Sequence, residues 1–493
     1  MQGPCPEVGQ GLFLYLRRGY LGVKETLKGA GKVGMRSIFF VLVLLLVTPA
    51  AAQQAPQSRA EINLSFAPLV KEAAPAVVNI YAKVIRAARR SPFAGDPFFE
   101  RFFGDLGAER PRVQNSLGSG VILSADGIVV SNYHVVGNAT DIRVVLADRR
   151  EFAADVLLAD EANDLAILLL RDAGGGLPHL NLRASDTVEV GELVLAIGNP
   201  FGVGQTVSSG IVSGLARSGA ARGRGRGYFI QTDAPINPGN SGGALIDVSG
   251  RLLGVNTSIL TRSGGSNGIG FAIPADLVAA FVAQARDGRD TFGRPWAGIR
   301  AQRMEADIAE AFGLDVPAGV VVSALHPDSP FAQAGVARGD VITAVAGGAV
   351  NSPSEMLYRL SVIGLGNTAV VDVYRDGRTR KVTVLLAEAP DVPTRQEIVL
   401  GREALLEGMR LVRINPAVIV EFGLPLEAQG VLVAQAGALG QRAGLRQGDV
   451  IEAINQRLVN TPRDAAGAFS DGASRFLVTV VRDGRRISIR FRV

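Results

Sequence analysis

The chain has 493 residues, of which 47% are hydrophobic and 20% charged, and this ordinary composition indicates a globular protein of about three domains. Residues 1–52 hold six of the 51 basic and two of the 46 acidic residues, so the rest carries 45 against 44 and the net charge gives no support to nucleic-acid binding. The single cysteine, Cys5, excludes internal disulfides and cysteine-based metal sites, and three scattered histidines argue against a histidine-rich centre. We expect no metal and no cofactor.

The N-terminus has the charged, apolar and small-residue order of a secretory signal. Basic residues as far as Arg36 precede an apolar run over 38–47, and the alanines that end at Ala52 fit the cleavage pattern. The run is too short to span a bilayer comfortably. We therefore predict that residues 1–52 are an N-terminal extension and signal peptide cleaved after Ala52, with Met35 as a second candidate start and an uncleaved anchor as the alternative. Membrane association is not expected after cleavage.

A phenylalanine-rich segment follows at residues 92–104 and is flanked by proline, glycine and charged residues. A loop cannot leave that much apolar area in water without a partner surface. We expect this apolar surface to be covered, and the segment's own domain is one candidate for the covering surface.

Two polar residues border predicted buried strands. His134 stands at the end of a strand over 129–136, and Asp164 opens the apolar run 164–170. His179 lies in a glycine- and proline-rich loop with no strand to fix it, so His134 is the candidate general base and Asp164 the acid that orients it. The alternative acids are more exposed and are interpreted as loop residues: Asp148 and Asp160.

An arginine- and glycine-rich run covers residues 221–227. Such runs occur in RNA-binding proteins, but a lone, short run between two predicted strands is typical of a loop. We expect no nucleic-acid partner.

The stretch over 239–243 places Ser241 among glycines. A serine hydroxyl needs an adjacent base to act as a nucleophile, and the glycines let backbone N–H groups converge on one point. The same letters fit the nucleophile elbow of α/β-hydrolases, which requires a helix after the serine and a later histidine. Residues 244–255 read instead as strand, turn and strand, and the only later histidine, His326, lies in another module. The order His, Asp, Ser is therefore favoured.

Three blocks, residues 131–136, 163–166 and 239–245, resemble the catalytic blocks of the HtrA/DegP (Do-like) family of serine endopeptidases. The resemblance runs from about Leu64 to the C-terminus. It implies a mainly β protein in which residues 53–286 form a trypsin-like protease domain, a chymotrypsin-like double β-barrel with the site between the barrels.

The resemblance also implies roles for individual residues. His134 would act as base and then acid, Asp164 would hold its tautomer, and Ser241 would form the acyl-enzyme. The N–H groups of Gly239 and Ser241 would form the oxyanion hole. Pro235 and Ile236 would lie at the substrate pocket, which favours cleavage after residues such as Val, Ala or Ile.

The C-terminal half contains a repeat. The Gly-Asp pair at 339–340 recurs at 448–449, and the Asp-Gly pair at 376–377 recurs at 483–484. Two copies of about 100 residues are domain-sized, which excludes a solenoid repeat. The pattern resembles PDZ domains, which are α+β, partly open β-barrels, over 287–390 and 391–493.

PDZ domains bind an extended C-terminal peptide as an added strand, and backbone N–H groups of a loop hold its carboxylate. In the first copy this resemblance assigns the loop to Trp296, Ala297, Gly298 and Ile299. In the second copy it would be residues 406–409, where Glu407 is an unfavourable neighbour for a carboxylate.

The sequence thus predicts a periplasmic serine endopeptidase that degrades unfolded or damaged proteins. It needs no ATP in this interpretation, since no Walker A motif is present. Hydrophobic C-terminal peptides would bind the PDZ modules for recruitment and activation, and the resemblance implies a homotrimer or a multiple of trimers. The alternatives are a regulatory sensor protease with a dedicated target and a chaperone-like PDZ scaffold with little catalysis.

Overall fold

The computed structural model describes residues 65–86, 112–199, 204–217, 228–237, 239–259, 268–402 and 404–492. The predicted signal peptide, the phenylalanine-rich segment and the arginine- and glycine-rich run lie outside these residues. None of the helices in the described ranges has the length and apolar character that a membrane crossing requires.

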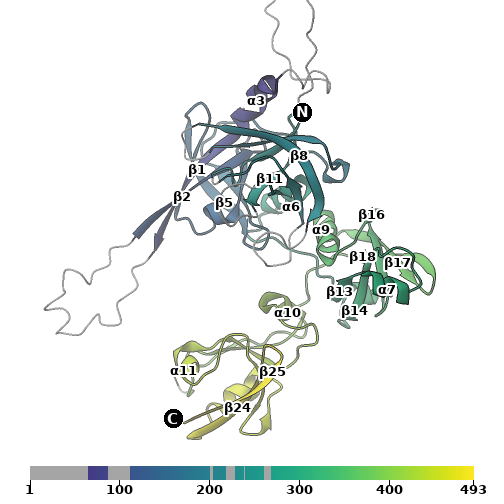
Figure 1. Cartoon of the computed structure of the whole chain (residues 1–493). Helices are drawn as coiled ribbons and strands as arrows, with labels where there is room; N and C mark the ends of the chain where they lie inside the picture. The colour runs from purple at the N-terminus through teal and green to yellow at the C-terminus, as the bar shows by residue number, and fades with distance from the viewer. Residues whose placement is uncertain are drawn as a thin grey trace, which may run out of the picture. The chain divides into compact units, whose positions relative to one another are not determined.

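The first six strands close into a barrel in the order β1-β2-β3-β6-β5-β4. Three of them, β1, β2 and β5, are labelled in Figure 1. Many of its β-branched and leucine side chains are buried. In β3 all four residues are at most 3% exposed, because side chains on both faces of this strand are covered. The elements are α3 (Ala67–Ala73), η1 (Ala74–Ala76), β1 (Val77–Arg86), β2 (Arg112–Ile122), β3 (Ile128–Ser131), α5 (Tyr133–Val136), β4 (Asp141–Val145), β5 (Glu151–Asp160) and β6 (Leu165–Leu170).

The next six strands close into a second barrel, whose order β7-β8-β9-β12-β11-β10 repeats the first. Helix α6 follows it and packs against β11 and β12 through buried side chains such as Val278 and Phe281. The predicted double β-barrel is confirmed. The elements are η2 (Ser185–Thr187), β7 (Leu193–Gly198), β8 (Thr206–Arg217), β9 (Phe229–Thr232), β10 (Ala244–Asp247), β11 (Leu252–Ile259), β12 (Gly270–Pro274) and α6 (Ala275–Arg286).

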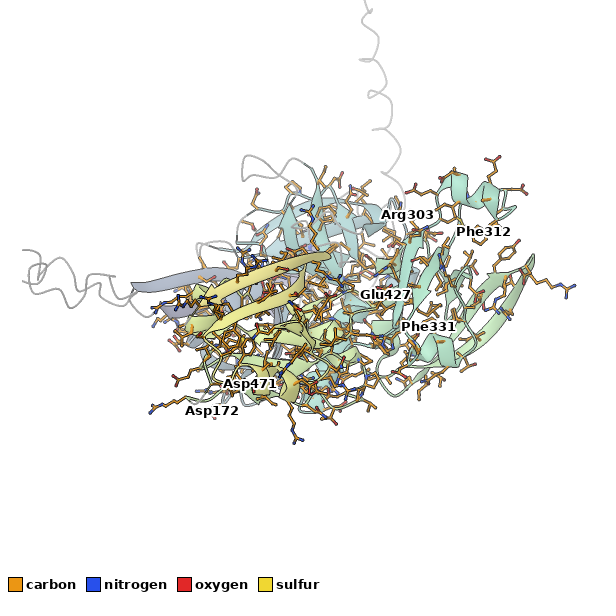
Figure 2. All side chains as sticks on the ribbon, turned by 90° about the horizontal axis from the view of Figure 1, so that it is seen from below. Asp172, Arg303, Phe312, Phe331, Glu427 and Asp471 are labelled. Atoms are coloured by element: carbon orange, nitrogen blue, oxygen red, sulfur yellow. The ribbon has the colours of Figure 1, made fainter. Side chains whose placement is uncertain are left out.

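The first C-terminal module is a sheet in the order β13-β14-β15-β17-β18, with β16 paired to β15. Ser329 caps helix α8, and the adjacent Phe331 (Figure 2) is buried in the core of this module. The elements are β13 (Ile299–Arg303), α7 (Ala306–Ala311), β14 (Val320–Leu325), α8 (Pro330–Gln333), β15 (Val341–Val345), β16 (Gly348–Ala349), α9 (Pro353–Ile363), β17 (Thr368–Arg375) and β18 (Arg378–Leu385).

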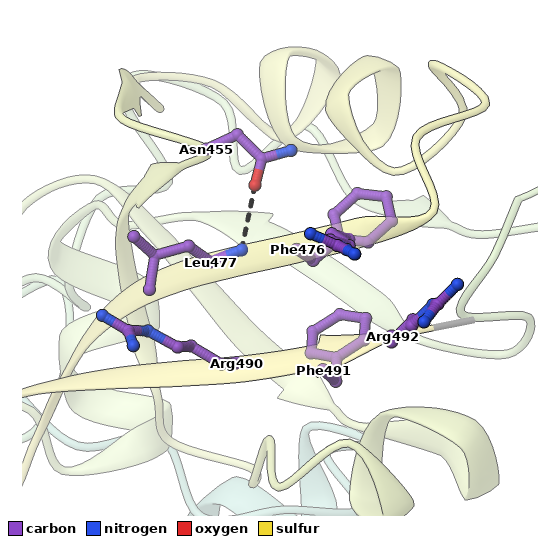
Figure 3. A pocket seen from close by; sticks show the side chains of 7 residues that line it. Asn455, Phe476, Leu477, Arg490, Phe491 and Arg492 are labelled. Carbon is purple, nitrogen blue, oxygen red and sulfur yellow. Dashed lines mark hydrogen bonds between the residues drawn. The ribbon is translucent and has the colours of Figure 1, made fainter.

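The second C-terminal module repeats this topology as β20-β21-β22-β24-β25, with β23 paired to β22 and β19 added beside β20. Phe476 and Phe491 stack across the last two strands and line a shallow groove (Figure 3). The elements are β19 (Ile398–Val399), β20 (Arg410–Arg413), α10 (Pro416–Phe422), β21 (Val431–Gln435), α11 (Gly437–Arg442), β22 (Val450–Ile454), β23 (Arg457–Leu458), α12 (Pro462–Ala468), β24 (Arg475–Arg482) and β25 (Arg485–Arg492).

The repeated residues have the same structural role in both modules. Asp340 and Asp449 are buried and each pairs with an arginine, Arg375 and Arg482 respectively. The predicted Asp-Gly turns join β17 to β18 and β24 to β25. Because both residues of each turn have positive φ, from 50° to 77°, the preference for glycine and aspartate is explained.

Candidate active site

Strand pairing in the first barrel brings His134 and Asp164 together. Strands β3 and β6 are antiparallel, with Ser131 opposite Ala166. His134 lies three residues beyond the end of β3 and Asp164 immediately precedes β6, so both fall at the same edge of the barrel.

The predicted strand over 129–136 is wrong in its second half. Strand β3 ends at Ser131, and residues 133–136 form the one-turn helix α5, which carries His134. Val135 and Val136 are buried in this helix, as they would also be in a strand. The apolar pattern therefore does not distinguish a helix from a strand here. His134 keeps 27% of its side-chain surface exposed and can face a substrate.

The backbone of Asp164 adopts a left-handed conformation, with φ of 54°. Aspartate tolerates this conformation better than most residues. The amide of the buried Asn132 donates to the Asp164 carbonyl at 2.9 Å and holds the chain in this turn. The carboxylate is therefore directed toward His134 by backbone geometry.

The Asp164 carboxylate accepts hydrogen bonds from both the ring and the backbone of His134. The distances are 2.8 Å from Nδ1 to Oδ2 and 3.0 Å from the backbone nitrogen to Oδ1. A carboxylate only accepts, so the ring hydrogen is on Nδ1 and Nε2 is free to take a proton. Burial raises the pKa of the Asp164 carboxyl, but the hydrogen bonds from His134, the charge of its ring when protonated, and the Thr257 hydroxyl outweigh it and hold this pKa below its ordinary value.

Ser241 lies in the loop before β10, and contact with the first barrel fixes this loop. A Cβ at Gly242 would lie 2.1 Å from the carbonyl oxygen of Ser119, so only glycine fits there, and its φ is 83°. Strands β10 and β11 follow with no helix between them, which confirms the rejection of the α/β-hydrolase elbow.

Thr257 on β11 connects the nucleophile to the acid, and the sequence interpretation missed it. The Ser241 hydroxyl donates to the Thr257 carbonyl at 3.0 Å, and the Thr257 hydroxyl donates to Oδ2 of Asp164 at 2.6 Å. Thr257 therefore links Ser241 to Asp164, and Asp164 in turn holds the imidazole of His134. A serine, an imidazole and a carboxylate in one connected group can cooperate in acyl transfer.

The other residues predicted at the site precede Ser241 by two to six positions in the chain. Gly239 has φ of 99°, a conformation that favours glycine, and precedes the nucleophile by two positions. Pro235 is exposed and its carbonyl accepts from Ser208 at 2.7 Å. Ile236 is 2% exposed and packs in the core of the second barrel.

The remaining histidines and acids lie elsewhere. The ring of His179 is bonded to the carbonyl of Leu177, two residues away, and His326 lies in the first C-terminal module. Asp148 binds its neighbour Arg150, and Asp160 accepts from the backbone of Asn163. None of these contacts involves Ser241, His134 or Asp164.

The predicted peptide-binding loop leads into β13. Trp296 is 9% exposed, its backbone N–H donates to the Ala387 carbonyl at 2.8 Å, and its indole meets the His326 ring edge-on. Gly298 has φ of 60°, and its carbonyl accepts from the N–H of His326 at 2.8 Å. Ala297 is buried and Ile299 begins the strand. The loop is therefore held firmly at both ends.

Comparison with known proteins agrees with this architecture. Residues 118–255 match the trypsin-like peptidase domain, and residues 295–386 match the PDZ domain. The chain is 36% identical over 433 residues to the periplasmic pH-dependent serine endoprotease DegQ of Escherichia coli K12, which covers 87% of this chain and 91% of that protein. It is 34% identical over 483 residues to a probable periplasmic DegP-like serine endoprotease of Pseudomonas fluorescens, covering 93% and 98%. Among solved structures, the HtrA-type protease AlgW with tripeptide is 36% identical and covers 66% of this chain and 98% of its own, with a TM-score of 0.50.

The double barrel, the PDZ modules and these relatives define a serine endoprotease of the periplasm. The chain belongs to the HtrA family of DegP- and DegQ-like serine endoproteases.

Proposed function

We propose that this endoprotease degrades unfolded or damaged polypeptides and that Ser241, His134 and Asp164 perform the hydrolysis. One observation carries the proposal. The Asp164 carboxylate accepts hydrogen bonds from His134 and from the Thr257 hydroxyl. The Ser241 hydroxyl donates a hydrogen bond to the carbonyl of the same Thr257. This arrangement joins a nucleophile, an unprotonated Nε2 and an orienting acid within one hydrogen-bonded group.

In the first half of the reaction, the Ser241 hydroxyl turns from the Thr257 carbonyl toward Nε2 of His134. The serine oxygen attacks the peptide carbonyl carbon while its proton passes to Nε2. The N–H groups of Gly239 and Ser241 stabilise the negative oxygen that forms. The carbon–nitrogen bond then breaks, and the imidazolium gives its proton to the leaving amine.

In the second half, a water molecule gives a proton to Nε2 and its oxygen attacks the acyl carbon. The ester bond to Ser241 breaks, the serine oxygen recovers the proton and the acid product leaves. Pro235 and Ile236 present no charged side chain to the residue before the cleaved bond. We therefore place Val, Ala or Ile at this position of the substrate.

The first PDZ module binds hydrophobic C-terminal peptides in this proposal, through the loop of Trp296, Ala297, Gly298 and Ile299. The solved complex of AlgW with a tripeptide supports peptide binding by this chain. Captured chains are held at high effective concentration near the cleft. A homotrimer, or a multiple of trimers, is the proposed assembly, with its evidence in the family resemblance.

The test compares the wild-type chain with Ser241→Ala and with Ser249→Ala, a control at an exposed serine in the next turn. Reduced, unfolded casein is the substrate, and labelling by a fluorophosphonate is measured with and without a peptide ending in hydrophobic residues. Wild type and Ser249→Ala should cleave and be labelled, and Ser241→Ala should only bind.

Cleavage by Ser241→Ala would refute the assignment of the nucleophile. A wild-type chain that binds casein but neither cleaves it nor reacts would favour the PDZ scaffold. Labelling that does not change with the peptide would refute activation through the PDZ module.

A further inference from the structure

Ser119 on β2 donates two hydrogen bonds to the loop that carries Ser241, one to the carbonyl of Gly239 and one to the carbonyl of Ser241. It is completely buried in the first barrel. Its hydroxyl donates to the Gly239 carbonyl at 2.6 Å, and its backbone N–H donates to the Ser241 carbonyl at 2.9 Å. The two bonds grip the loop on either side of Asn240, at the two residues proposed to supply the oxyanion hole.

The Ser119 hydroxyl is itself held in one orientation. The N–H of Asn199, at the end of β7, donates to its oxygen at 2.8 Å, so the hydroxyl hydrogen is left to point at Gly239. On the opposite side, the Ser131 hydroxyl donates to the Ser119 carbonyl at 2.8 Å. Asn199 of the second barrel therefore orients the Ser119 hydroxyl before the substrate arrives, while Ser131 contacts only the Ser119 carbonyl.

Loss of the Ser119 hydroxyl would affect Gly239 and Ser241 differently. Ser241 would keep its bond to the Ser119 N–H, which no side-chain change removes. Gly239 has φ of 99° and no side chain to restrict it, so its peptide groups can rotate once the carbonyl is released. Loss of the hydroxyl thus acts on the Gly239 N–H while leaving the nucleophile in place.

We propose, on the basis of the function proposed above, that Ser119 is a positioning residue for the oxyanion hole. Its hydroxyl fixes the Gly239 carbonyl and keeps the Gly239 N–H directed at the site where the substrate oxygen becomes negative. Ser119 does not touch the substrate. It acts by keeping a donor oriented before the reaction, which is the condition for electrostatic stabilisation of a transition state.

The experiment compares Ser119→Ala with Ser131→Ala in the full chain. Ser131 is an equally buried hydroxyl in the same barrel that contacts the Ser119 carbonyl instead of the loop. The substrate is a fluorogenic peptide from a site that the wild type cleaves in casein. Two ligands of the same sequence are also compared, a peptide boronate, which forms a tetrahedral adduct with an oxygen in the hole, and a peptide amide, which does not.

Removal of one oxyanion donor typically lowers kcat about 100- to 1,000-fold. In Ser119→Ala the Gly239 N–H is still present but is no longer held in one orientation, so the loss should be smaller. We expect Ser119→Ala to lower kcat about 10- to 100-fold while KM stays within about twofold of wild type. The affinity for the peptide boronate should fall by the same factor as kcat/KM. Binding of the peptide amide should not change. Ser131→Ala should keep kcat within about threefold, because the grip on Gly239 persists.

Two results would overturn the inference: a folded Ser119→Ala with kcat and boronate affinity within twofold of wild type, or an equal loss in Ser131→Ala. If Ser119→Ala does not fold by circular dichroism, Ser119→Cys replaces it, since a thiol occupies the same place but donates weakly. Unchanged kcat in that variant would also contradict the inference. A wild-type chain that does not cleave would instead refute the proposed function.

Discussion

Thr257 donates its hydroxyl hydrogen to the Asp164 carboxylate at a distance of 2.6 Å. This bond fixes the carboxylate that orients His134, and hydrogen bonds to charged groups contribute about 1.5–3 kcal/mol. Replacement of the hydroxyl by a methyl group in Thr257→Val keeps the shape and removes the donor. We expect kcat for casein peptides to fall about tenfold in steady-state kinetics. Thr257→Ser, which restores the hydroxyl, should recover most of the rate. Equal loss in both variants would contradict a role for this bond.

The lowered pKa of Asp164 makes a prediction about stability in acid. A carboxyl whose pKa is lower in the folded state than its unfolded value of 3.8 stabilises the fold above that value. This contribution disappears as the pH falls through the folded pKa, because the unfolded chain then binds the proton first. Between about pH 5 and pH 3, wild type should therefore lose unfolding free energy more steeply than Asp164→Asn. Urea unfolding at several pH values measures both slopes, and parallel slopes would contradict the prediction.

The double barrel and the PDZ repeat could be predicted because each has a local signal in the sequence. His134, Asp164 and Ser241 stay predictions, made because the first two border apolar runs and glycines surround the third. The apolar pattern could not distinguish the short helix of His134 from a strand, since Val135 and Val136 are buried in either geometry. Element boundaries of this kind depend on the turn that follows and not on the apolar pattern.

The sequence does not point to Ser119 and Thr257, because their contacts with Gly239 and Asp164 form only when the barrels close. A buried serine or threonine in a strand gives the same pattern as any other strand residue. For Thr257 a signal existed, since the turn at Ser249 and Gly250 folds β11 back on β10 and places Thr257 within about one residue of Ser241. For Ser119 no such local signal exists, since 120 positions separate it from Gly239.

The peptide-binding loop makes a steric prediction at Gly298. A Cβ there would lie 2.8 Å from Ser329 Cβ and 2.9 Å from Trp296 Cζ2, so Gly298→Ala must displace the loop. The control is Gly335→Ala, which also has a positive φ, 86° against 60° for Gly298, and no atom within 4 Å of the added carbon. Gly298→Ala should lower the affinity for a labelled hydrophobic C-terminal peptide at least about tenfold, as measured by fluorescence anisotropy. Gly335→Ala should leave this affinity unchanged. Equal affinities for the two variants would exclude this loop as the binding site.

The buried ion pair of the first PDZ module predicts a loss of stability in Arg375→Met. The Asp340 carboxylate is 1% exposed and is bonded to Arg375 and to the N–H of Ala337. Removal of the arginine leaves this buried charge with the Ala337 N–H and a longer contact to Arg380 at 3.9 Å. Breaking a fully buried pair costs about 3–5 kcal/mol. Because Arg375 keeps 30% of its side chain exposed, we expect a smaller loss in unfolding free energy, about 2 kcal/mol.

Trp296 is the only tryptophan of the chain and lies in this module, so its fluorescence in urea follows the unfolding of the module within the intact protein. The matched control is Arg378→Met, an exposed arginine on the other side of the same hairpin turn, which should change the unfolding free energy by less than about 0.5 kcal/mol. Coincident transitions for the two variants would mean that Asp340 finds another partner, and the repeated pair would then not stabilise the module. If the pair is stabilising, the loss should appear in the Trp296 signal while cleavage of casein peptides that do not bind the PDZ module stays unchanged.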